Sequence, residues 1–347
     1  MEYRRLGRSG IEVSAVSFGT MTFGEQTSEA DAHRLLDVCL DRGINMIDAS
    51  ETYPVPSTGG TRGLTEKYIG TWLAARGNRD KVIVATKVAG RTQRMDFLGR
   101  GETRLNRAQI ETAVEGSLRS LQTDYIDLYQ LHWPDRAVNI FGRLNFPYGA
   151  EEEPVPLEET LAVLGDLVAA GKVRRVGVSN ETPWGIMGFL SAAEASGLPR
   201  IDSIQNPFNV MNRTFEIGLS EITMREDVGL LAYSPMAMGA LSGKYQNGAK
   251  PEGTRGALFP GFMGRYANEQ AYAAIGKYGA LARGHGLDAS QMGLAYVLTR
   301  PFVTSAIVGA TSQGQLEAAL GALDVDLTPE ILDGIEAIHT RYPNPCP

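Results

Sequence analysis

The sequence lacks several features that would place it in a specialised class of protein. Only two of the 347 residues are cysteines, Cys39 and Cys346, and neither lies in a Cys-x-x-Cys motif. This scarcity excludes a disulfide-stabilised scaffold and a zinc site, so we expect no metal. No apolar run approaches the roughly 18 residues of a transmembrane helix. No apolar stretch follows Arg4 and Arg5, so the start of the chain does not resemble a signal peptide.

An excess of positive charge is also missing. The 33 Lys and Arg residues are outnumbered by 40 Asp and Glu residues, which gives a formal net charge of −7. This acidic balance argues against nucleic acid or an anionic membrane as the main partner. Because 43% of the residues are hydrophobic, the chain can bury a large core. We therefore expect a folded cytoplasmic protein with no nucleic-acid or membrane partner.

Three common motifs of nucleotide-binding and hydrolytic enzymes are absent as well. No Gly-x-Gly-x-x-Gly opens a helix after a predicted strand, and the segment Gly59–Gly63, which comes nearest, has a different spacing. The sequence contains no Gly-x-x-x-x-Gly-Lys-Ser/Thr and no Gly-x-Ser-x-Gly. These absences argue against a Rossmann dehydrogenase, a P-loop nucleotidase and an α/β-hydrolase.

Short apolar runs alternate with amphipathic stretches along nearly the whole chain. Eight runs predict strands: Val16–Gly19, Met46–Asp48, Val82–Lys87, Tyr125–His132, Val173–Ser179, Asp202–Gln205, Gly229–Ser234 and Ser305–Gly309. Stretches with helical periodicity between them include Ser28–Asp41, Leu64–Arg76, Ala108–Leu121, Leu157–Ala170 and Asp288–Thr299. Eight parallel strands joined by helical crossovers favour a closed barrel over a doubly wound sheet.

Two long connections interrupt this rhythm. Trp133–Pro156 follows the fourth predicted strand, and the glycine-rich segment Gly239–Gln270 follows the seventh. In a barrel both would leave the carboxyl ends of strands, where active-site loops lie. The sequence shows no linker, so we expect residues 1–347 to form a single domain.

Polar residues stand at the ends of the second, third and fourth predicted strands. Asp48, Lys87 and His132 end these strands, and Tyr53 follows Asp48 closely. A barrel brings all four to one face. An ammonium beside a phenol favours the phenolate and lowers its pKa, a carboxylate fixes the ammonium, and an imidazole can donate to a carbonyl oxygen. The set predicts protonation of a C=O group.

Each of these residues has a simpler interpretation when it is considered alone. A strand-end Lys or Asp is usually a solvated terminus, and Tyr53 could be a packing aromatic. His132, which precedes Trp133-Pro134, could be a histidine satisfied by its neighbours at the start of a loop. Four chemically matched residues on three consecutive strands favour the catalytic interpretation.

The later strand ends carry polar groups of another kind. Asn180 and Gln205 could bond a ligand carboxamide, and Tyr233 could stack on a planar ring. Phosphate sites in barrels often form after the seventh and eighth strands. Lys244 and Arg255 could supply positive charge there, although both could be ordinary surface residues.

Several of these segments together resemble the aldo-keto reductase superfamily. Asp48–Tyr53 is similar to its Asp-x-Ala-x-x-Tyr signature, Ala85–Lys87 to its lysine strand and Leu121–Pro134 to its histidine strand. Further matches are Gly19–Met21, Gly177–Asn180 and Gly309–Thr311. Within the superfamily the chain resembles the bacterial Tas-like NADP(H)-dependent reductases, which are related to potassium-channel β subunits. That resemblance lies in Gly19–Gln26, Tyr53–Pro56, Ser179–Thr182 and Asn247–Pro251.

The resemblance implies an α/β fold, a (β/α)₈ TIM barrel with an N-terminal β-hairpin and long loops after strands 4 and 7. It also implies that NADPH or NADP⁺ lies extended over the carboxyl face. Tyr53 would be the general acid, with Lys87 lowering its pKa, Asp48 anchoring Lys87 and His132 orienting the carbonyl. The cofactor-binding residues that it implies are Thr20, Met21, Gln26, Asp48, Ser179, Asn180, Gln205, Tyr233, Ser234, Pro235, Met236, Lys244, Arg255, Gly309, Thr311 and Gln315.

The same resemblance assigns these residues to parts of the cofactor. Ser179, Asn180 and Gln205 would hold the carboxamide, while Tyr233 stacks on the nicotinamide. The segment Ser234–Met236, together with Lys244 and Arg255, would meet the phosphates. The adenosine end would lie against Gly309, Thr311 and Gln315.

Two positions depart from the usual family pattern. Pro54 stands where Gly is common, as in the Tas-like group, and predicts an extended backbone at Tyr53. Ala318-Ala319 replaces a Glu-Asn pair that relatives often carry, so adenine contacts from that helix are expected to be weaker.

The implied activity is NADPH-dependent reduction of an aldehyde or ketone to an alcohol, or the reverse oxidation, on a small-molecule carbonyl substrate. One alternative is an NADP(H)-binding regulatory or redox-sensing module with slow turnover. Another is a phosphate-binding barrel enzyme without nicotinamide, but this explains neither Tyr53 nor Lys87. The sequence leaves open which carbonyl compound is the substrate and whether the chain forms a homo-oligomer.

Overall fold

A closed barrel of eight parallel strands forms the centre of the molecule. The computed structural model describes residues 1–149, 153–259 and 261–347. The barrel strands are β3 (Val16–Gly19), β4 (Met46–Asp48), β5 (Ile83–Val88), β6 (Ile126–Leu131), β7 (Val173–Ser179), β8 (Ile201–Pro207), β9 (Gly229–Tyr233) and β10 (Val303–Val308). Each pairs with its sequence neighbour, and β10 closes on β3. The predicted (β/α)₈ barrel is confirmed.

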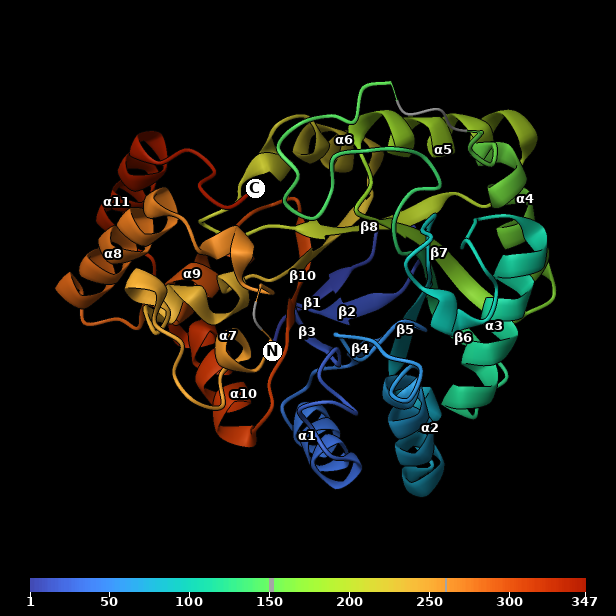
Figure 1. The fold of residues 1–347 in the computed structure, drawn as a ribbon, viewed down its shortest axis with the longest axis horizontal. Helices are drawn as coiled ribbons and strands as arrows, with labels where there is room; N and C mark the ends of the chain where they lie inside the picture. The colour runs from blue at the N-terminus through green and yellow to red at the C-terminus, as the bar shows by residue number, and fades with distance from the viewer. Residues whose placement is uncertain (150–152, 260) are drawn as a thin grey trace.

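Helices surround these strands. The six that follow β3 to β8 are α1 (Glu29–Asp41), α2 (Leu64–Arg76), α3 (Arg107–Leu121), α4 (Leu157–Ala169), α5 (Pro183–Ser196) and α6 (Leu219–Glu226). The remaining helices are α7 (Arg255–Leu258), α8 (Glu269–Gly284), α9 (Ala289–Leu298), α10 (Gln313–Leu320) and α11 (Pro329–Arg341). In Figure 1, α1 to α6 follow one another around the strands, and α8 to α11 occupy the remaining side.

Local sequence signals fix the ends of several helices. Ser28 and Asn106 accept hydrogen bonds from backbone N–H groups in the first turns of α1 and α3, which otherwise lack partners. Gly43, Gly77 and Gly171 follow α1, α2 and α4 with φ values of 80°, 58° and 72°. This left-handed backbone favours glycine and terminates a helix.

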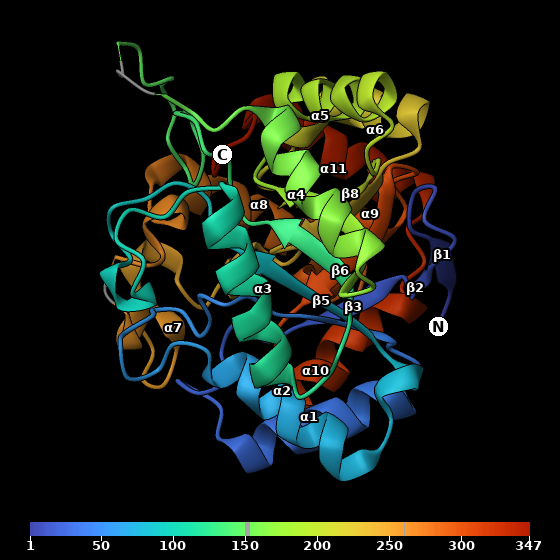
Figure 2. The same ribbon diagram turned by 90° about the vertical axis from the view of Figure 1, so that its right-hand side faces the viewer.

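An N-terminal hairpin closes one end of the barrel. Strands β1 (Tyr3–Arg5) and β2 (Glu12–Ser14) pair antiparallel. Leu6 and Val13 from this hairpin are fully buried against Met46, Leu128 and Leu231 inside the barrel. Figure 2 shows the hairpin at one side of the molecule, and the long β6–α4 connection and α7 at the other. The functional residues at the carboxyl ends of the strands therefore lie at the end away from the hairpin.

The two long connections differ in structure. The segment between β6 and α4 contains no helix or strand in its described residues, and 150–152 lie outside them. The segment between β9 and α8 contains α7 and the 3₁₀ helices Ala237–Ser242, Gln246–Gly248 and Gly264–Tyr266. The sequence predicted only a long glycine-rich connection here, so these short helices are an addition to that prediction. Met238 and Asn247 have φ values of 54° and 55°, which keep the helical pieces short.

Among the residues that the structure describes, no helix combines the length and the apolar character needed to cross a lipid bilayer.

Candidate active site

A buried ion pair lies at the carboxyl ends of two neighbouring strands. Lys87 Nζ on β5 is 2.7 Å from Asp48 Oδ2 on β4 and 2.7 Å from the carbonyl oxygen of Ala49. The exposed fraction is 0% for Lys87 and 2% for Asp48. Asp48 pairs with Ala85 across the strands, so Lys87, two residues further along, faces the same side of the sheet. The register between β4 and β5 therefore brings the two charged side chains together.

Two glutamines hold the second oxygen of Asp48. Gln205 Nε2 on β8 donates to Asp48 Oδ1 at 2.8 Å, and Gln130 Nε2 on β6 donates to it at 3.4 Å. Gln205 Nε2 also lies 3.2 Å from Gln130 Oε1. Because three strands supply partners to both carboxylate oxygens, Asp48 holds Lys87 in one position.

Tyr53 and His132 stand in front of this ion pair. Lys87 Nζ donates to the half-buried Tyr53 Oη at 3.4 Å. The rings of Tyr53 and His132 meet edge to face, with centroids 5.7 Å apart. His132 lies one residue beyond β6, and its Nδ1 is 3.1 Å from Ser50 Oγ. The four residues predicted to be catalytic are thus brought together.

The turn that carries Tyr53 is tied to its surroundings by the backbone. Gly63 N donates to Tyr53 O at 2.9 Å, and Val55 N donates to Met21 O at 3.1 Å. The peptide bonds before Pro54 and Pro56 are both cis.

The electrostatics of this group differ from the prediction in one respect. Lys87 was expected to lower the pKa of Tyr53, but burial and the Asp48 carboxylate raise that pKa well above its usual value. The physical reason is that Asp48 neutralises the Lys87 ammonium at 2.7 Å, whereas Tyr53 is 3.4 Å away. Burial, together with the Lys87 charge, holds the pKa of His132 well below its usual value. Tyr53 and His132 are therefore both neutral near pH 7.

Four residues from the later strand ends form a hydrogen-bonded group, which Asn180 connects to His132. Asn180 Nδ2 donates to His132 O at 2.9 Å, and Tyr233 Oη donates to Asn180 Oδ1 at 2.8 Å. Ser179 Oγ donates to Gln205 O at 2.7 Å. Gln205 Oε1 accepts no hydrogen bond from any residue that the structure describes. The group thus presents an amide oxygen that is available to a ligand.

The turn after β3 borders the ion pair on another side. Thr20 Oγ1 donates to Asp48 O at 2.7 Å, and Thr20 is fully buried against the end of β4. Met21 and Gln26 follow in the same turn and are half-buried. Gln26 N donates to Thr22 O at 3.0 Å, which closes the turn.

The loop after β9 contains the residues predicted to meet phosphates, Ser234, Pro235, Met236, Lys244 and Arg255. Ser234, Ala237 and Met238 have φ values between 52° and 54°. Runs of mixed right- and left-handed residues can present N–H groups as an anion-binding concavity. Lys244 is exposed and Arg255 half-buried, and neither forms an ion pair with a carboxylate in the described part of the chain. Burial lowers the pKa of Arg255.

The residues predicted to hold an adenosine lie after β10. Thr311 N and Oγ1 donate to Gln315 Oε1 at 2.9 and 3.1 Å. Gly309 is exposed, and a methyl group added to it would lie 3.4 Å from Gly19 O. The ends of β10 and β3 therefore meet, which places this group beside the turn of Thr20.

Sequence reasoning missed several supporting residues. Gln130 precedes His132 by two positions on one strand, so the period of a strand could have placed both side chains on one face. Ser50 lies within the Asp48–Tyr53 segment. Glu51 Oε1 accepts from Arg100 Nη2 at 2.7 Å and from Ala89 N at 2.8 Å, but no local pattern signals a pair 49 residues apart.

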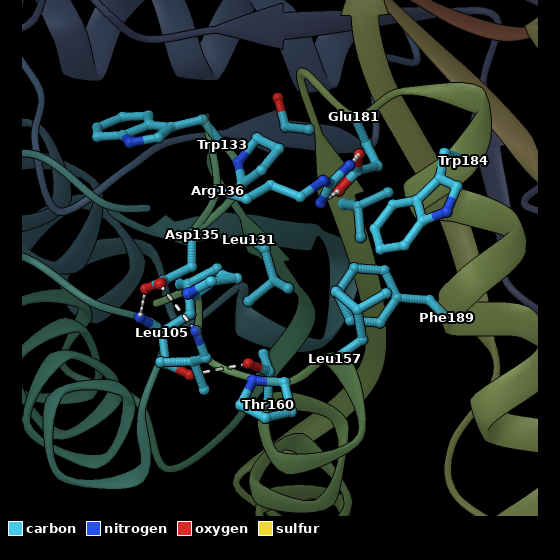
Figure 3. A pocket seen from close by; sticks show the side chains of 16 residues that line it. Leu105, Leu131, Trp133, Asp135, Arg136, Leu157, Thr160, Glu181, Trp184 and Phe189 are labelled. Carbon is cyan, nitrogen blue, oxygen red and sulfur yellow. Dashed lines mark hydrogen bonds and ion pairs between the residues drawn. The ribbon is translucent and has the colours of Figure 1, made fainter. Parts of the chain in front are cut away.

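A separate pocket lies on the outer side of β6 and β7, next to α4 and α5. Figure 3 shows its largely apolar wall, which includes Trp133, Phe189 and the exposed Trp184. The ion pair between the half-buried Arg136 and the buried Glu181 borders it. This pair attaches the β6–α4 connection to the residue that follows Asn180.

Comparison with known proteins identifies the family to which this chain belongs. The model of the aldo/keto reductase family matches residues 15–340. The chain belongs to the aldo/keto reductase family. This membership makes it an oxidoreductase of a family that generally uses nicotinamide cofactors and small-molecule substrates.

Relatives within the family cover nearly the whole chain. The chain is 48% identical to protein tas of Escherichia coli (strain K12) over 347 residues, which is 100% of both chains. It is 32% identical to the uncharacterized oxidoreductase YrpG of Bacillus subtilis (strain 168), over 99% of this chain and 97% of the relative. A probable voltage-gated potassium channel subunit beta of Oryza sativa subsp. japonica is 30% identical over 99% of this chain and 98% of its own. The predicted likeness to both groups is confirmed.

The described residues contain no cluster of three or more His, Cys, Asp or Glu side chains that could hold a metal ion.

Proposed function

We propose that this aldo/keto reductase is a single-domain NADP(H)-dependent enzyme that reduces an aldehyde or ketone to an alcohol, or catalyses the reverse oxidation. The observation that carries the proposal is the position of Tyr53. Its hydroxyl lies 3.4 Å from the Lys87 ammonium and its ring packs against neutral His132. A protonated phenol beside an imidazole and a fixed cation suits the protonation of a carbonyl oxygen.

The nicotinamide, when bound, would supply the hydride. Tyr53 would give its proton to the carbonyl oxygen, and Lys87 would stabilise the phenolate that remains. A high pKa of Tyr53 keeps the proton in place before reaction, and the ammonium favours the anion once it forms. Asp48 would hold Lys87 still, so the ammonium does not reorganise during proton transfer.

His132 would orient the substrate. If Ser50 donates its hydroxyl proton to Nδ1, the imidazole carries its own proton on Nε2. That N–H would donate to the carbonyl oxygen and hold it near Tyr53. A neutral imidazole suits this role, because the low pKa of His132 keeps it uncharged across the physiological range.

The chemistry of the later strand ends supports NADP(H) as the cofactor. Ser179, Asn180 and Gln205 offer hydroxyl and amide groups to a carboxamide, and Tyr233 offers an aromatic face. Arg255 is half-buried without a carboxylate partner among the described residues, a costly arrangement for a cation unless an anionic ligand completes it. A 2′-phosphate is such an anion, and we propose that Arg255 and Lys244 select NADPH over NADH. Met21 and Gln26, together with Gly309, Thr311 and Gln315, would complete the binding surface.

The experiment that tests this proposal is NADPH consumption with a reactive aromatic aldehyde, with the alcohol identified as the product. We expect turnover that is higher with NADPH than with NADH. Tight NADPH binding without turnover on a panel of aldehydes and ketones would contradict the proposal. That result would favour the alternative of a redox-sensing module. The similarity to a potassium-channel β subunit is the reason for considering this alternative.

A further inference from the structure

The turn that carries Tyr53 is bonded along the end of β5. Glu51 N donates to Lys87 O at 3.3 Å, and Ala89 N donates to Glu51 Oε1 at 2.8 Å. Lys87 and Ala89 are two residues apart, so the backbone and the side chain of Glu51 form successive bonds along the same stretch of chain. Glu51 therefore ties the turn of Tyr53 to the strand that carries Lys87.

A second segment of the chain holds Glu51 from the other side. Arg100 Nη2 donates to Glu51 Oε1 at 2.7 Å. The exposed fraction is 9% for the Arg100 side chain and 11% for that of Glu51, so this ion pair is screened less than one on the surface. In the described part of the chain, no other side chain of residues 92–103 hydrogen-bonds residues 49–53.

Arg100 lies in a loop of the β5–α3 connection with a fixed base. Thr92 and Thr103 form an isolated antiparallel bridge, in which Thr103 N donates to Thr92 O at 2.9 Å. Residues 92–103 therefore leave and rejoin the connection at one point. Because the base is fixed, the guanidinium of Arg100 is presented to Glu51 from an anchored segment.

The same loop contacts the strand end that carries His132. Leu98 is buried in an apolar cluster with Trp133, the residue that follows His132. Trp133 Nε1 also donates to Arg91 O, beside the base of the loop, at 3.1 Å. The loop thus contacts both the turn of Tyr53 and the neighbour of His132.

The separation that this arrangement controls is the one between Tyr53 and Lys87. Tyr53 Oη and Lys87 Nζ are 3.4 Å apart, which is longer than most hydrogen bonds. A displacement of about 1 Å in an active site can lower the rate about 100-fold. Glu51 precedes Tyr53 by two residues, so a shift of its carboxylate is transmitted to the phenol through a short turn.

Resting on the proposed function, we propose that Arg100 is a positioning residue for the reaction. Through Glu51 it holds the turn of Tyr53 at the distance from Lys87 that proton transfer requires. Arg100 does not touch the reacting atoms, and its guanidinium acts by fixing a carboxylate in place. Loss of this contact should slow the chemical step and leave cofactor binding unchanged.

Kinetics of Arg100→Met with a reactive aromatic aldehyde test this role. We expect kcat to fall by about 10- to 100-fold, while KM for the aldehyde and Kd for NADPH stay within about 3-fold of wild type. The isotope effect with NADPH deuterated at the transferred position should rise, because hydride transfer becomes slower than product release. Arg100→Lys, which keeps the charge, should recover part of kcat. Arg91→Met breaks the ion pair between Arg91 and Glu102 in the same connection and is the control, with kcat unchanged.

A double variant separates positioning from charge compensation. Arg100→Met leaves the Glu51 carboxylate without its cation, and adding Glu51→Gln removes that charge while keeping an oxygen for Ala89 N. The melting temperature should therefore recover in the double variant, but kcat should stay low. Recovery of kcat together with the melting temperature would overturn the positioning role and leave the proposed reduction intact. A kcat of Arg100→Met within about 2-fold of wild type would overturn it as well.

Amide hydrogen exchange tests the same contact without turnover, so it applies even if wild type reduces no aldehyde and the proposed function fails. Exchange of residues 50–53, followed by mass spectrometry, should be about 10- to 100-fold faster in Arg100→Met and in the double variant than in wild type. Arg91→Met should exchange as wild type does. Unchanged exchange of this turn in Arg100→Met would overturn the proposal.

Discussion

Two regions of the carboxyl face are built in different ways. At the ends of β4, β5 and β6, Asp48, Lys87 and His132 are almost fully buried, and each is bonded to other parts of the protein. Around β9 and α7 the predicted phosphate-binding residues are more exposed. Lys244 lies in solvent, and Arg255 has no carboxylate partner in the described chain.

The difference distinguishes the proposed catalytic residues, whose charges are paired within the protein, from the proposed cofactor-binding residues, whose charges are not. Catalytic groups must hold their geometry before the substrate arrives, so the fold satisfies their charges internally. Groups that bind an anion are more useful when their charge is left uncompensated, because the ligand then supplies the missing partner. If this comparison is correct, mutations in the first region change stability and turnover together, whereas mutations in the second change affinity.

The largest expected effect comes from breaking the buried ion pair. Lys87→Met leaves the Asp48 carboxylate buried without its cation, so we expect the free energy of unfolding to fall by about 3–5 kcal/mol. Turnover should fall as well, since no ammonium then stabilises a phenolate at Tyr53. Urea denaturation and NADPH consumption measure the two losses.

A double variant separates charge from catalysis in this region. Asp48→Asn combined with Lys87→Met removes both charges, so stability should recover most of the loss. Turnover should not recover. Recovery of turnover would show that the ion pair supports the fold and does not take part in the reaction.

A smaller effect is expected in the second region. Arg255→Gln should raise the Kd for NADPH by about 10- to 100-fold and change the Kd for NADH much less. The free protein should be no less stable, because a half-buried and unpaired cation has been removed. Fluorescence titration and thermal unfolding provide the two readouts. Lys250→Gln, which changes an exposed lysine of the same connection, is the control and should leave the Kd values for both cofactors unchanged. An equal rise in the Kd values for NADPH and NADH in Arg255→Gln would contradict the role assigned to Arg255.

The smallest effect concerns pH and His132. The pKa of His132 in the folded protein lies well below the ordinary value of 6.5. Below pH 6.5 the unfolded chain therefore binds a proton at this side chain that the folded chain does not bind. The stability present above pH 6.5 is therefore lost as the pH falls towards the folded pKa. At about pH 5.5 the loss is on the order of 1 kcal/mol.

Urea unfolding of wild type and His132→Gln from about pH 8 to about pH 5 isolates this contribution. Burial raises the pKa of Glu66 to about 7, so its stabilisation is present at low pH and declines as the pH rises through that value. This opposite slope is common to both proteins and cancels in the difference. Parallel stability curves for the two proteins would show that His132 is not held neutral.

Much of the barrel follows from local sequence patterns. The predicted strand Val16–Gly19 and the predicted helix Leu64–Arg76 match β3 and α2 residue for residue. Because the carboxyl ends of parallel strands meet, the sequence also predicts that Asp48, Lys87 and His132 lie together. Tyr53 joins them because a short turn connects it to Asp48.

Other features depend on contacts between distant segments, which leave no periodic signal. Arg100 and Glu51 pair only because the chain after β5 folds back over the Tyr53 turn. The pKa of Tyr53 was predicted in the wrong direction, since a list of neighbours does not show that burial and Asp48 outweigh Lys87.

The most direct test of the central claim is Tyr53→Phe, which removes one hydroxyl and keeps the ring. Turnover of a reactive aromatic aldehyde should fall by about 10²- to 10⁴-fold, because no general acid remains. The Kd for NADPH should stay within about 3-fold of wild type, a change of less than about 0.7 kcal/mol. Turnover equal to that of wild type would contradict the account, because the proton would then come from another group.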